Sequence, residues 1–297
     1  MLDLSVIVPV RNAEAFLPAC LTSIKEADVA EIVVVDGSST DRTVAIARTF
    51  TGHVQDDNGQ GVAAARMLGA RHASSGNIAL IDVDIVLPDG ALGSLFHEFE
   101  SGGYAALQAG LISTSGNGYW GRALVFHHNH GRSKHWPGVM ATIFRKSLLL
   151  SYGLDEWFKS GEDIELRWRL QRGTEKLGVS RTTLVSHRFE DTFACALGQF
   201  KADGEGLARM VLKYKVPALK LLGIPAAGAV RGLLISLREK QPQYILYFMV
   251  YLIMNYVAMF RTLLSTRYPE ATGSETDASS PSSPRLPQDM RTEQSNG

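Results

Sequence analysis

Short apolar runs rich in β-branched residues alternate with helical segments along the first third of the chain, and this alternation constrains the fold most. Residues 4–10 (LSVIVPV), 31–35 (EIVVV) and 78–81 (IALI) are three such runs. Each is followed by polar or glycine residues, which is typical of buried parallel strands. The segment between the first two runs has apolar residues at helical spacing. Strands that alternate with helices predict an open α/β sheet with helices on its faces.

Polar side chains stand at the carboxyl ends of these three expected strands. Arg11 follows the first, Asp36 ends the second, and Asp82 and Asp84 follow the third. In open α/β sheets ligands bind beyond the carboxyl ends of the strands. We therefore expect a ligand site at this edge.

Composition limits the class of protein and its partners. The chain has 297 residues, of which 45% are hydrophobic and 20% charged, as in a folded domain with one sizeable core. Thirty basic residues balance thirty acidic ones, so no overall field would recruit nucleic acid. The two cysteines form no CxxC pair and no basic leader precedes the first apolar run, so we expect a reducing, cytoplasmic setting.

The character of the chain changes after about residue 195. Residues 200–240 combine apolar side chains with an excess of Lys and Arg, which is typical of basic amphipathic helices at a membrane surface. Residues 244–260 are an uncharged run of about seventeen residues, at the lower limit for crossing a bilayer. This run could span the membrane, lie in its interface, close the soluble core or form a dimer interface.

These changes predict three units. Residues 1–195 would form the catalytic domain, and residues 196–265 would be basic amphipathic and apolar helices that associate with a membrane. Residues 266–297 are rich in Ser, Pro, Thr and Gln without apolar periodicity, so we expect a disordered tail.

Two acidic motifs suggest how a nucleotide could be bound. Asp82 and Asp84, one residue apart after a strand, could hold Mg²⁺ or Mn²⁺, because these ions prefer oxygen ligands. Acidic residues at this spacing also occur in ordinary surface turns. Asp36 could accept a hydrogen bond from a nucleotide base, or it could be only a turn residue before Gly37.

Taken in order, these segments resemble the family 2 glycosyltransferases of the GT-A fold, over roughly residues 4–190. The resemblance is carried by residues 5–12 (SVIVPVRN), 33–41 (VVVDGSSTD), 65–66 (AR), 76–84 (GNIALIDVD, with the DxD motif), 153–156 (GLDE) and 161–166 (GEDIEL, with the ED motif). It implies a GT-A fold, which is a Rossmann-like open mixed sheet flanked by helices. The C-terminal amphipathic and apolar helices would follow that fold.

The resemblance also implies roles on the nucleotide side. Pro9 and Arg11 would border the nucleoside pocket, and Asp36 would contact the base. Asp82 would lie near the ribose or the metal. Arg66 could neutralise the diphosphate, although an arginine on a helix is more often part of a solvated face.

On the metal and acceptor side, Asp84 would be the direct metal ligand. His187 matches a position where related enzymes can supply a third ligand, and imidazole suits Mn²⁺ better than Mg²⁺. Asp163 matches the carboxylate that deprotonates the acceptor hydroxyl, giving single displacement with inversion. Glu162 would border the acceptor, although the pair Glu162 and Asp163 could instead cap a helix.

Residues 110–138 are rich in Gly, His and Trp without clean periodicity, so we expect a binding loop there. Trp120 and Trp136 would form a wall for the acceptor, because flat aromatic faces stack on sugar rings. The histidines at positions 127, 128, 130 and 135 could suggest zinc, but no cysteine or carboxylate adjoins them. Met67 stands where many relatives have Asn, and no QxxRW motif follows the ED segment, which argues against processive synthesis of the cellulose type.

The sequence thus predicts an inverting, metal-dependent glycosyltransferase that uses Mn²⁺ or Mg²⁺. It would move a sugar from a nucleoside-diphosphate sugar to a hydroxyl of a lipid-linked or glycan acceptor, as in cell-envelope polysaccharide or glycolipid synthesis. Its place would be the cytoplasmic face of a membrane. A catalytically inactive sugar-binding or scaffold protein is one alternative. A sugar-phosphate nucleotidyltransferase is another, but the chain lacks the glycine-rich basic phosphate loop of that chemistry at residues 8–11.

Overall fold

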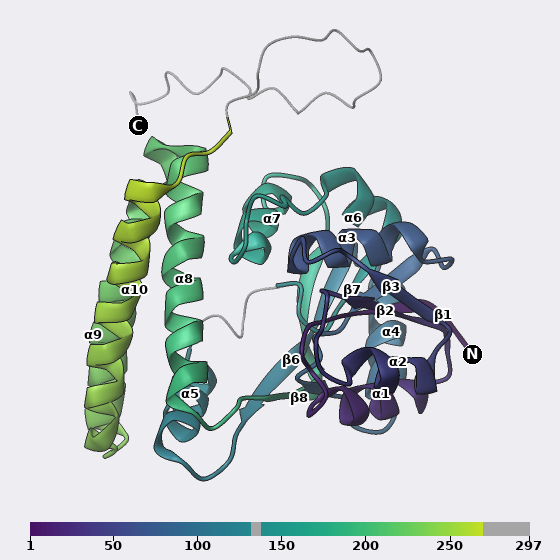
Figure 1. Cartoon of the computed structure of the whole chain (residues 1–297), viewed down its shortest axis with the longest axis horizontal. Coiled ribbons are helices and arrows are strands. Elements are labelled where there is room, and N and C mark those ends of the chain that lie inside the picture. Colours follow the sequence, from purple (N-terminus) through teal and green to yellow (C-terminus); the bar gives the residue numbers. More distant parts are fainter. Residues whose placement is uncertain (132–137, 270–297) are drawn as a thin grey trace, which may run out of the picture.

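The strands form one eight-stranded mixed sheet. Figure 1 shows this sheet to the right of the long C-terminal helices. The structure is a computed structural model that describes residues 1–131 and 138–269. The strands are β1 (Leu2–Val10), β2 (Val29–Asp36), β3 (His53–Asp56), β4 (Asn77–Leu80), β5 (Ile85–Val86), β6 (Ala106–Thr114), β7 (Thr142–Arg145) and β8 (Leu177–Arg188). Their order across the sheet is β3-β2-β1-β4-β7-β6-β8-β5.

Helices cover both faces of this sheet and continue beyond it. They are α1 (Leu17–Lys25), α2 (Thr43–Phe50), α3 (Val62–His72), α4 (Ala91–Ser101), α5 (Tyr119–Asn129), α6 (Lys146–Tyr152), α7 (Glu162–Leu170), α8 (Phe193–Tyr214), α9 (Ile224–Arg238) and α10 (Ile245–Ser265). Two 3₁₀ helices, η2 (Val216–Gly223) and η3 (Pro242–Tyr244), precede α9 and α10. The expected α/β sheet with C-terminal helices is confirmed.

The sheet has a parallel half and a mixed half. Strands β3, β2, β1 and β4 are parallel neighbours, whereas β7 runs antiparallel to both β4 and β6. Strand β3 was not predicted, because it has only four residues, none of them buried, and Val54 is its one β-branched residue. It adds a further carboxyl end, at Asp56, to the edge where the ligand site is expected.

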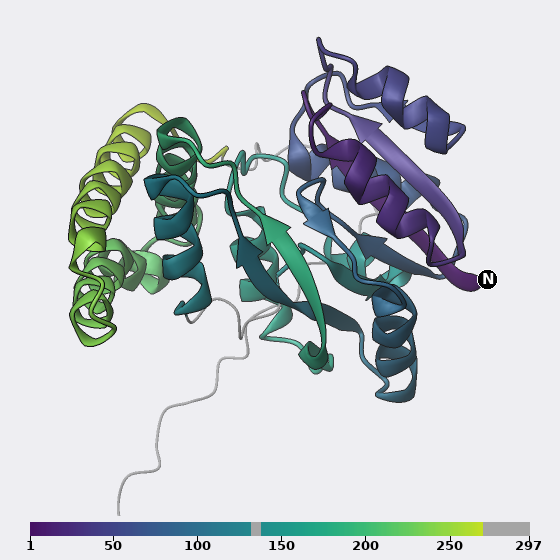
Figure 2. The same cartoon turned by 90° about the horizontal axis from the view of Figure 1, so that it is seen from below.

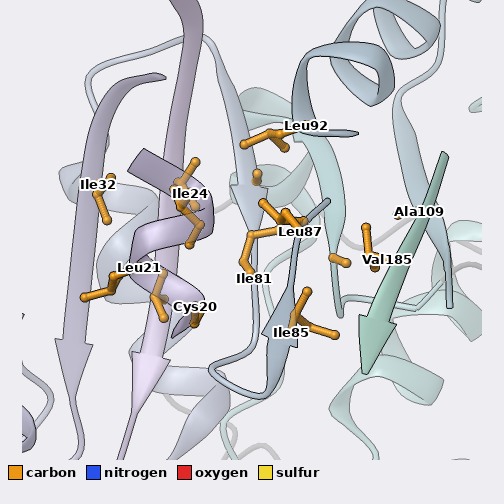
Figure 3. Packing of buried hydrophobic residues seen from close by; sticks show 14 of the residues in the cluster. Cys20, Leu21, Ile24, Ile32, Ile81, Ile85, Leu87, Leu92, Ala109 and Val185 are labelled. Atoms are coloured by element: carbon orange, nitrogen blue, oxygen red, sulfur yellow. The ribbon is translucent and has the colours of Figure 1, made fainter. Parts of the chain in front are cut away.

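Two hydrophobic clusters fill the two faces of the sheet. In β1, Val6 and Val8 point into the cluster under α1, α2 and α4, while Ile7 points into the cluster under α3, α6 and α7. Figure 3 shows the first cluster, with Leu21 and Ile24 of α1 beside strand residues such as Ile32. Burial on both faces explains why the strands are continuous apolar runs rather than alternating ones.

Residues 110–138 contain regular structure, so the prediction of a loop there was wrong. Strand β6 continues to Thr114, and helix α5 follows. The carboxylate of Asp191 fixes the start of α5, because it accepts hydrogen bonds from the backbone N–H groups of Gly118 and Gly121. His135 and Trp136 lie outside the described residues.

The C-terminal helices form a separate layered unit beside the sheet. Helix α8 lies between the sheet with its flanking helices and the pair α9 and α10, as Figures 1 and 2 show from two directions. Helices α8 and α10 pack very closely at Gly204, where a Cβ atom would stand 2.2 Å from the carbonyl oxygen of Asn255. The three predicted units stay a prediction, although α8 begins at Phe193 and α10 ends at Ser265, close to the expected bounds.

Candidate active site

The carboxyl end of β2 presents a buried carboxylate. Asp36 is paired with Val10 of β1 on one side and Asp56 of β3 on the other, and it is only 4% exposed. Its Oδ2 accepts a hydrogen bond of 2.9 Å from the N–H of Ser39. Its Oδ1 is buried without a hydrogen-bond partner among the described residues. Buried polar atoms are normally paired, so this oxygen is suited to an N–H group of a ligand.

Loops on either side of Asp36 shape the same edge. Backbone N–H groups of Gly59 and Gly61 donate to the carboxylate of Asp57, which holds the loop after β3 in place. Asp56 and Asp57 were missed from the sequence because β3 itself was missed. Pro9 is buried in β1, and the Arg11 side chain is exposed just beyond it, so nucleoside contacts of these two residues remain predictions.

Arg66 of α3 joins the DxD motif to the ED motif. Its Nη2 lies 2.6 Å from Oδ1 of Asp82, and its Nη1 lies 2.5 Å from Oε1 of Glu162. Arg66 is 3% exposed, so the alternative of a solvated helix face is wrong. Burial alone would lower the pKa of Arg66, but the charges of Asp82 and Glu162 outweigh it and raise that pKa. Contact of Arg66 with a diphosphate remains a prediction.

Asp84 and His187 face each other where β5 pairs with β8. Residue Ile85, next to Asp84, is opposite His187 in the antiparallel register. Nε2 of His187 lies 3.2 Å from Oδ2 of Asp84, while Oδ1 of Asp84 is buried without a hydrogen-bond partner in the described part of the chain. One carboxylate and one imidazole suit Mn²⁺, so the donor atoms fit the predicted metal.

The described ranges 1–131 and 138–269 contain no group of three or more His, Cys, Asp and Glu side chains arranged to hold a metal. A divalent ion at Asp84 would therefore need further oxygen ligands from substrate or water. Ions bound at phosphate-transfer sites commonly use one or two carboxylates together with substrate phosphates. A metal at Asp84 and His187 therefore stays a prediction.

Asp163 is the second residue of α7. The helix begins after Gly161, whose φ of 80° is a left-handed conformation that suits glycine. A small pocket beside Asp163 is lined by Gly138, Val139 and Arg167. A larger pocket of about 390 Å³, lined by residues such as Glu31, lies at the amino end of β2, away from this edge.

Helix α7 is held by charges from α8. Glu165 is fully buried and binds Arg169 on its own helix and Lys213 and Tyr214 on α8. Burial would raise the pKa of Glu165, but the hydrogen bonds from Arg169, Lys213 and Tyr214 lower it overall. Lys213 also binds Asp155 of the GLDE segment at 2.7 Å. The i, i+4 pair of Glu165 and Arg169 was visible in the sequence, but its partners on α8 were not.

Comparison with known proteins decides the family. The sequence model described as "Glycosyl transferase family 2" matches residues 5–155, about half of the chain. The chain belongs to glycosyl transferase family 2. The resemblance described from the sequence is thereby confirmed.

Named relatives of this family 2 protein include the pre-mycofactocin glycosyltransferase of Mycobacterium tuberculosis. The two are 29% identical over 203 residues, which are 62% of this chain and 42% of the relative. The match therefore spans only about two fifths of the relative's length.

Solved structures with a similar fold carry nucleotide sugars. The mannosyltransferase PcManGT from Pyrobaculum calidifontis, in complex with GDP-Man and Mn²⁺, is 18% identical and has a TM-score of 0.61, with 87% of each chain covered. TarS 1–349 of S. aureus, in complex with UDP-GlcNAc, is 17% identical with a TM-score of 0.54, and 90% of this chain and 93% of that one are covered. At these identities the likeness shows the fold, and the predicted GT-A fold is confirmed.

The carboxyl group of Asp203, on α8 of the family 2 protein, lies close to Asp163. Asp203 of α8 is half-buried, and its Oδ1 accepts a hydrogen bond of 3.2 Å from Nε2 of Gln199. Burial, with a contribution from the charge of Asp163, raises the pKa of Asp203 to about 7. One turn further along α8, the backbone of Gly206 touches that of Gly161. Asp203 was missed because α8 was interpreted only as a membrane helix.

The aromatic and histidine side chains of α5 pack against the C-terminal helices. The ring centroid of Trp120 is 4.6 Å from that of Phe193 on α8. An acceptor contact of Trp120 remains a prediction. Nδ1 of His127 lies 2.9 Å from the hydroxyl oxygen of Tyr247, and His128 packs against Phe189. Burial lowers the pKa of His127 to about 4. These contacts give the two histidines packing roles that do not require zinc.

Proposed function

We propose that this family 2 protein transfers a sugar from a nucleoside-diphosphate sugar to an acceptor hydroxyl. The observation that carries the proposal is a pair of buried carboxylate oxygens without partners among the described residues, Oδ1 of Asp36 and Oδ1 of Asp84. Asp36 ends β2, and Asp84 follows β4, on either side of β1. Neighbouring strands lie about 4.8 Å apart, so the carboxyl ends of β2 and β4 are roughly 10 Å apart. Asp84 lies beyond the end of β4, directly before β5. A nucleoside diphosphate bound across these strand ends would extend from Asp36 toward Asp84.

The donor would lie with its base at Asp36 and its diphosphate near Asp84. The carboxylate of Asp36 accepts a hydrogen bond from a base N–H group. A divalent metal at Asp84 and His187 would neutralise the charge of the departing diphosphate. Arg66 holds Asp82 beside this position, so the Asp82 carboxylate keeps its orientation without rearrangement. Preorganised charges of this kind favour the transition state.

Asp163 would act as the general base. It accepts the proton of the acceptor hydroxyl while the acceptor oxygen forms a bond to the anomeric carbon. The bond from that carbon to the diphosphate oxygen breaks, and its electron pair leaves with the nucleoside diphosphate. Attack from the side opposite the leaving group inverts the anomeric configuration.

The acceptor would be a lipid-linked or glycan hydroxyl at the cytoplasmic face of a membrane, as in cell-envelope polysaccharide or glycolipid synthesis. Two apolar stretches support this setting, Val216–Arg238 and Pro242–Ser265, which by length and composition alone could cross a membrane. They belong to the layer that packs on α8, and α8 packs on the start of α7. An acceptor anchored in a membrane would thus approach from the side of Asp163.

Donor binding tests this proposal first. Thermal unfolding would be followed with UDP-GlcNAc, UDP-glucose, UDP-galactose and GDP-mannose, each with and without Mn²⁺. We expect at least one donor to stabilise the protein only when Mn²⁺ is present, by about 2.7 kcal/mol at a hundredfold excess over its Kd. Asp36→Ala should abolish the stabilisation. If no nucleotide sugar stabilises the protein, the proposal is wrong. Stabilisation without release of nucleoside diphosphate would favour the scaffold alternative.

A further inference from the structure

The outermost helices expose many large apolar side chains. On α10 every large apolar side chain of one stripe is more than half exposed: Leu246, Met249, Ile253, Val257, Phe260 and Leu264. Their spacing of three and four residues places them on one side of the helix. Exposed large apolar side chains of α9 and η2 extend the surface: Val216, Leu219, Ile224, Val230, Leu234 and Leu237. A water-soluble monomer rarely leaves so large an apolar patch open, so this surface is expected to have a partner.

Basic side chains surround this apolar face. Residues 215–269 contain seven Lys and Arg residues, at positions 215, 220, 231, 238, 240, 261 and 267, but only one acidic residue, Glu239. The whole chain has no net charge, so the positive charge is concentrated here. Apolar helices rimmed by cations match a bilayer with anionic headgroups.

Six of these seven cations lie at the two ends of the helix pair, and Arg231 lies within α9. Helices α9 and α10 are antiparallel, because Gly228 faces Tyr251 while Gly232 faces Phe248. Positions 215 and 220 therefore lie near the end of α10 with positions 261 and 267, and positions 238 and 240 lie at the opposite end. The same concentration of positive charge would repel a second copy of this face, which disfavours a dimer formed through it.

Helix α8 prevents α10 from crossing a bilayer alone. The two helices are in backbone contact at Gly204, and α8 carries charged side chains along its length. Lys213 binds Asp155 and Glu165, so α8 is fastened to the catalytic part. A spanning α10 would draw these charges into hydrocarbon, which is strongly unfavourable. An amphipathic helix can instead lie in the interface with its apolar face embedded.

We propose that α9 and α10 are an in-plane anchor that embeds their exposed apolar face in one leaflet of an anionic bilayer without crossing it. The anchor does not depend on the proposed transfer reaction. Helix α8 alone separates the anchor from α7, and packed helices lie about 8–10 Å apart. The start of α7, with Asp163, would then stand roughly two helix layers from the membrane surface, within reach of a lipid-linked acceptor.

Vesicle flotation of the full chain tests the anchor. We expect binding to vesicles of phosphatidylcholine with about one third phosphatidylglycerol, and binding about tenfold or more weaker to pure phosphatidylcholine or at high salt. The double variant Ile253→Asp with Val257→Asp should lower binding about tenfold or more, since it places charges in the embedded face. Leu150→Asp, at an exposed apolar side chain of α6, is the matched control and should bind as the unchanged protein does.

Two outcomes would overturn the anchor. One is the absence of binding to anionic vesicles. The other is a dimer in sedimentation velocity that the double variant converts to a monomer while vesicle binding is unchanged.

Depth measurements separate an in-plane helix from a spanning one. The variants Leu246→Cys, Ile253→Cys and Leu264→Cys would each be made in a chain with Cys20→Ala and Cys195→Ser. The new thiol would carry a fluorophore that is quenched by lipids labelled at two depths. The proposal predicts a similar shallow depth at all three positions. A deep probe at 253 between shallow probes at 246 and 264 would show that α10 spans the bilayer and would overturn the proposal.

Discussion

Nη1 of Arg66 and Oε1 of Glu162 lie 2.5 Å apart, although 96 residues separate them in the chain. The same guanidinium binds Asp82, so one buried cation joins the DxD motif, the ED motif and helix α3. Burial raises the pKa of Glu162, and the charge of Asp163 adds to this effect, whereas Arg66 opposes it. Arg66 therefore determines both the position and the charge balance of the acidic residues around it.

Replacing Arg66 tests this link. Arg66→Met should lower the free energy of unfolding by about 3–5 kcal/mol, because it leaves the buried carboxylate of Glu162 and the partly buried carboxylate of Asp82 without their cation. Thermal or urea unfolding would measure the loss. Arg71→Met, on the exposed side of α3, is the control and should stay within about 0.5 kcal/mol of the unchanged protein. Equal stability of the two variants would contradict the role of Arg66.

Asp84 should determine metal-dependent nucleotide binding. Asp84→Asn should weaken the binding of UDP or GDP in the presence of Mn²⁺ by about tenfold to a hundredfold, because the ion loses a charged ligand. His187→Gln should have a smaller effect of the same kind. Titration calorimetry with and without Mn²⁺ measures both. Asp89→Asn, at an exposed carboxylate five residues on, serves as the control. Unchanged Mn²⁺-dependent binding in Asp84→Asn would rule out this metal site.

Asp203 should make stability depend on pH. Its pKa is raised from 3.8 to about 7, so the folded protein holds a proton that the unfolded chain releases between these values. Its contribution to the free energy of unfolding is therefore present at acidic pH and lost as the pH rises toward and through about 7.

Asp203→Asn removes this titration. The melting temperatures of the variant and of the unchanged protein would be compared at each pH. The variant's advantage should grow between pH 5 and pH 8, by an amount equivalent to about 1–2 kcal/mol of unfolding free energy after allowance for solvent screening. Gln199→Leu removes a hydrogen bond that lowers this pKa, so it should move the transition to higher pH. A temperature difference for Asp203→Asn that does not change with pH would contradict the assignment.

The parts predicted from the sequence have strong local signals. Strands β1, β2 and β4 are buried on both faces, so they appear as continuous apolar runs, and their polar ends mark the ligand edge. The start of α7 also follows from its sequence, because Gly161 and the acidic residues after it form a typical helix start. The family resemblance then linked these local features.

The parts that were missed depend on contacts distant in the chain. Helix α5 lacks a clear apolar period because His127 packs on Tyr247 and Phe248, about 120 residues away, rather than facing water. The position of Asp203 beside Asp163 follows from the packing of α8 on α7, which no local pattern encodes. Strand β3 is short and half-exposed, so pairing with β2 rather than its composition makes it a strand.

The release of nucleoside diphosphate from nucleotide sugars tests the central claim most directly. The full chain would be incubated with UDP- and GDP-sugars and Mn²⁺, with water and a bacterial membrane lipid extract as acceptors, beside Asp163→Asn and the exposed control Glu156→Gln. We predict that the unchanged protein and Glu156→Gln both release nucleoside diphosphate. The rate of release by Asp163→Asn should be lower by about 10²–10⁴-fold, while its Mn²⁺-dependent nucleotide binding is retained. No release from any donor, or a full rate in Asp163→Asn, would contradict the account.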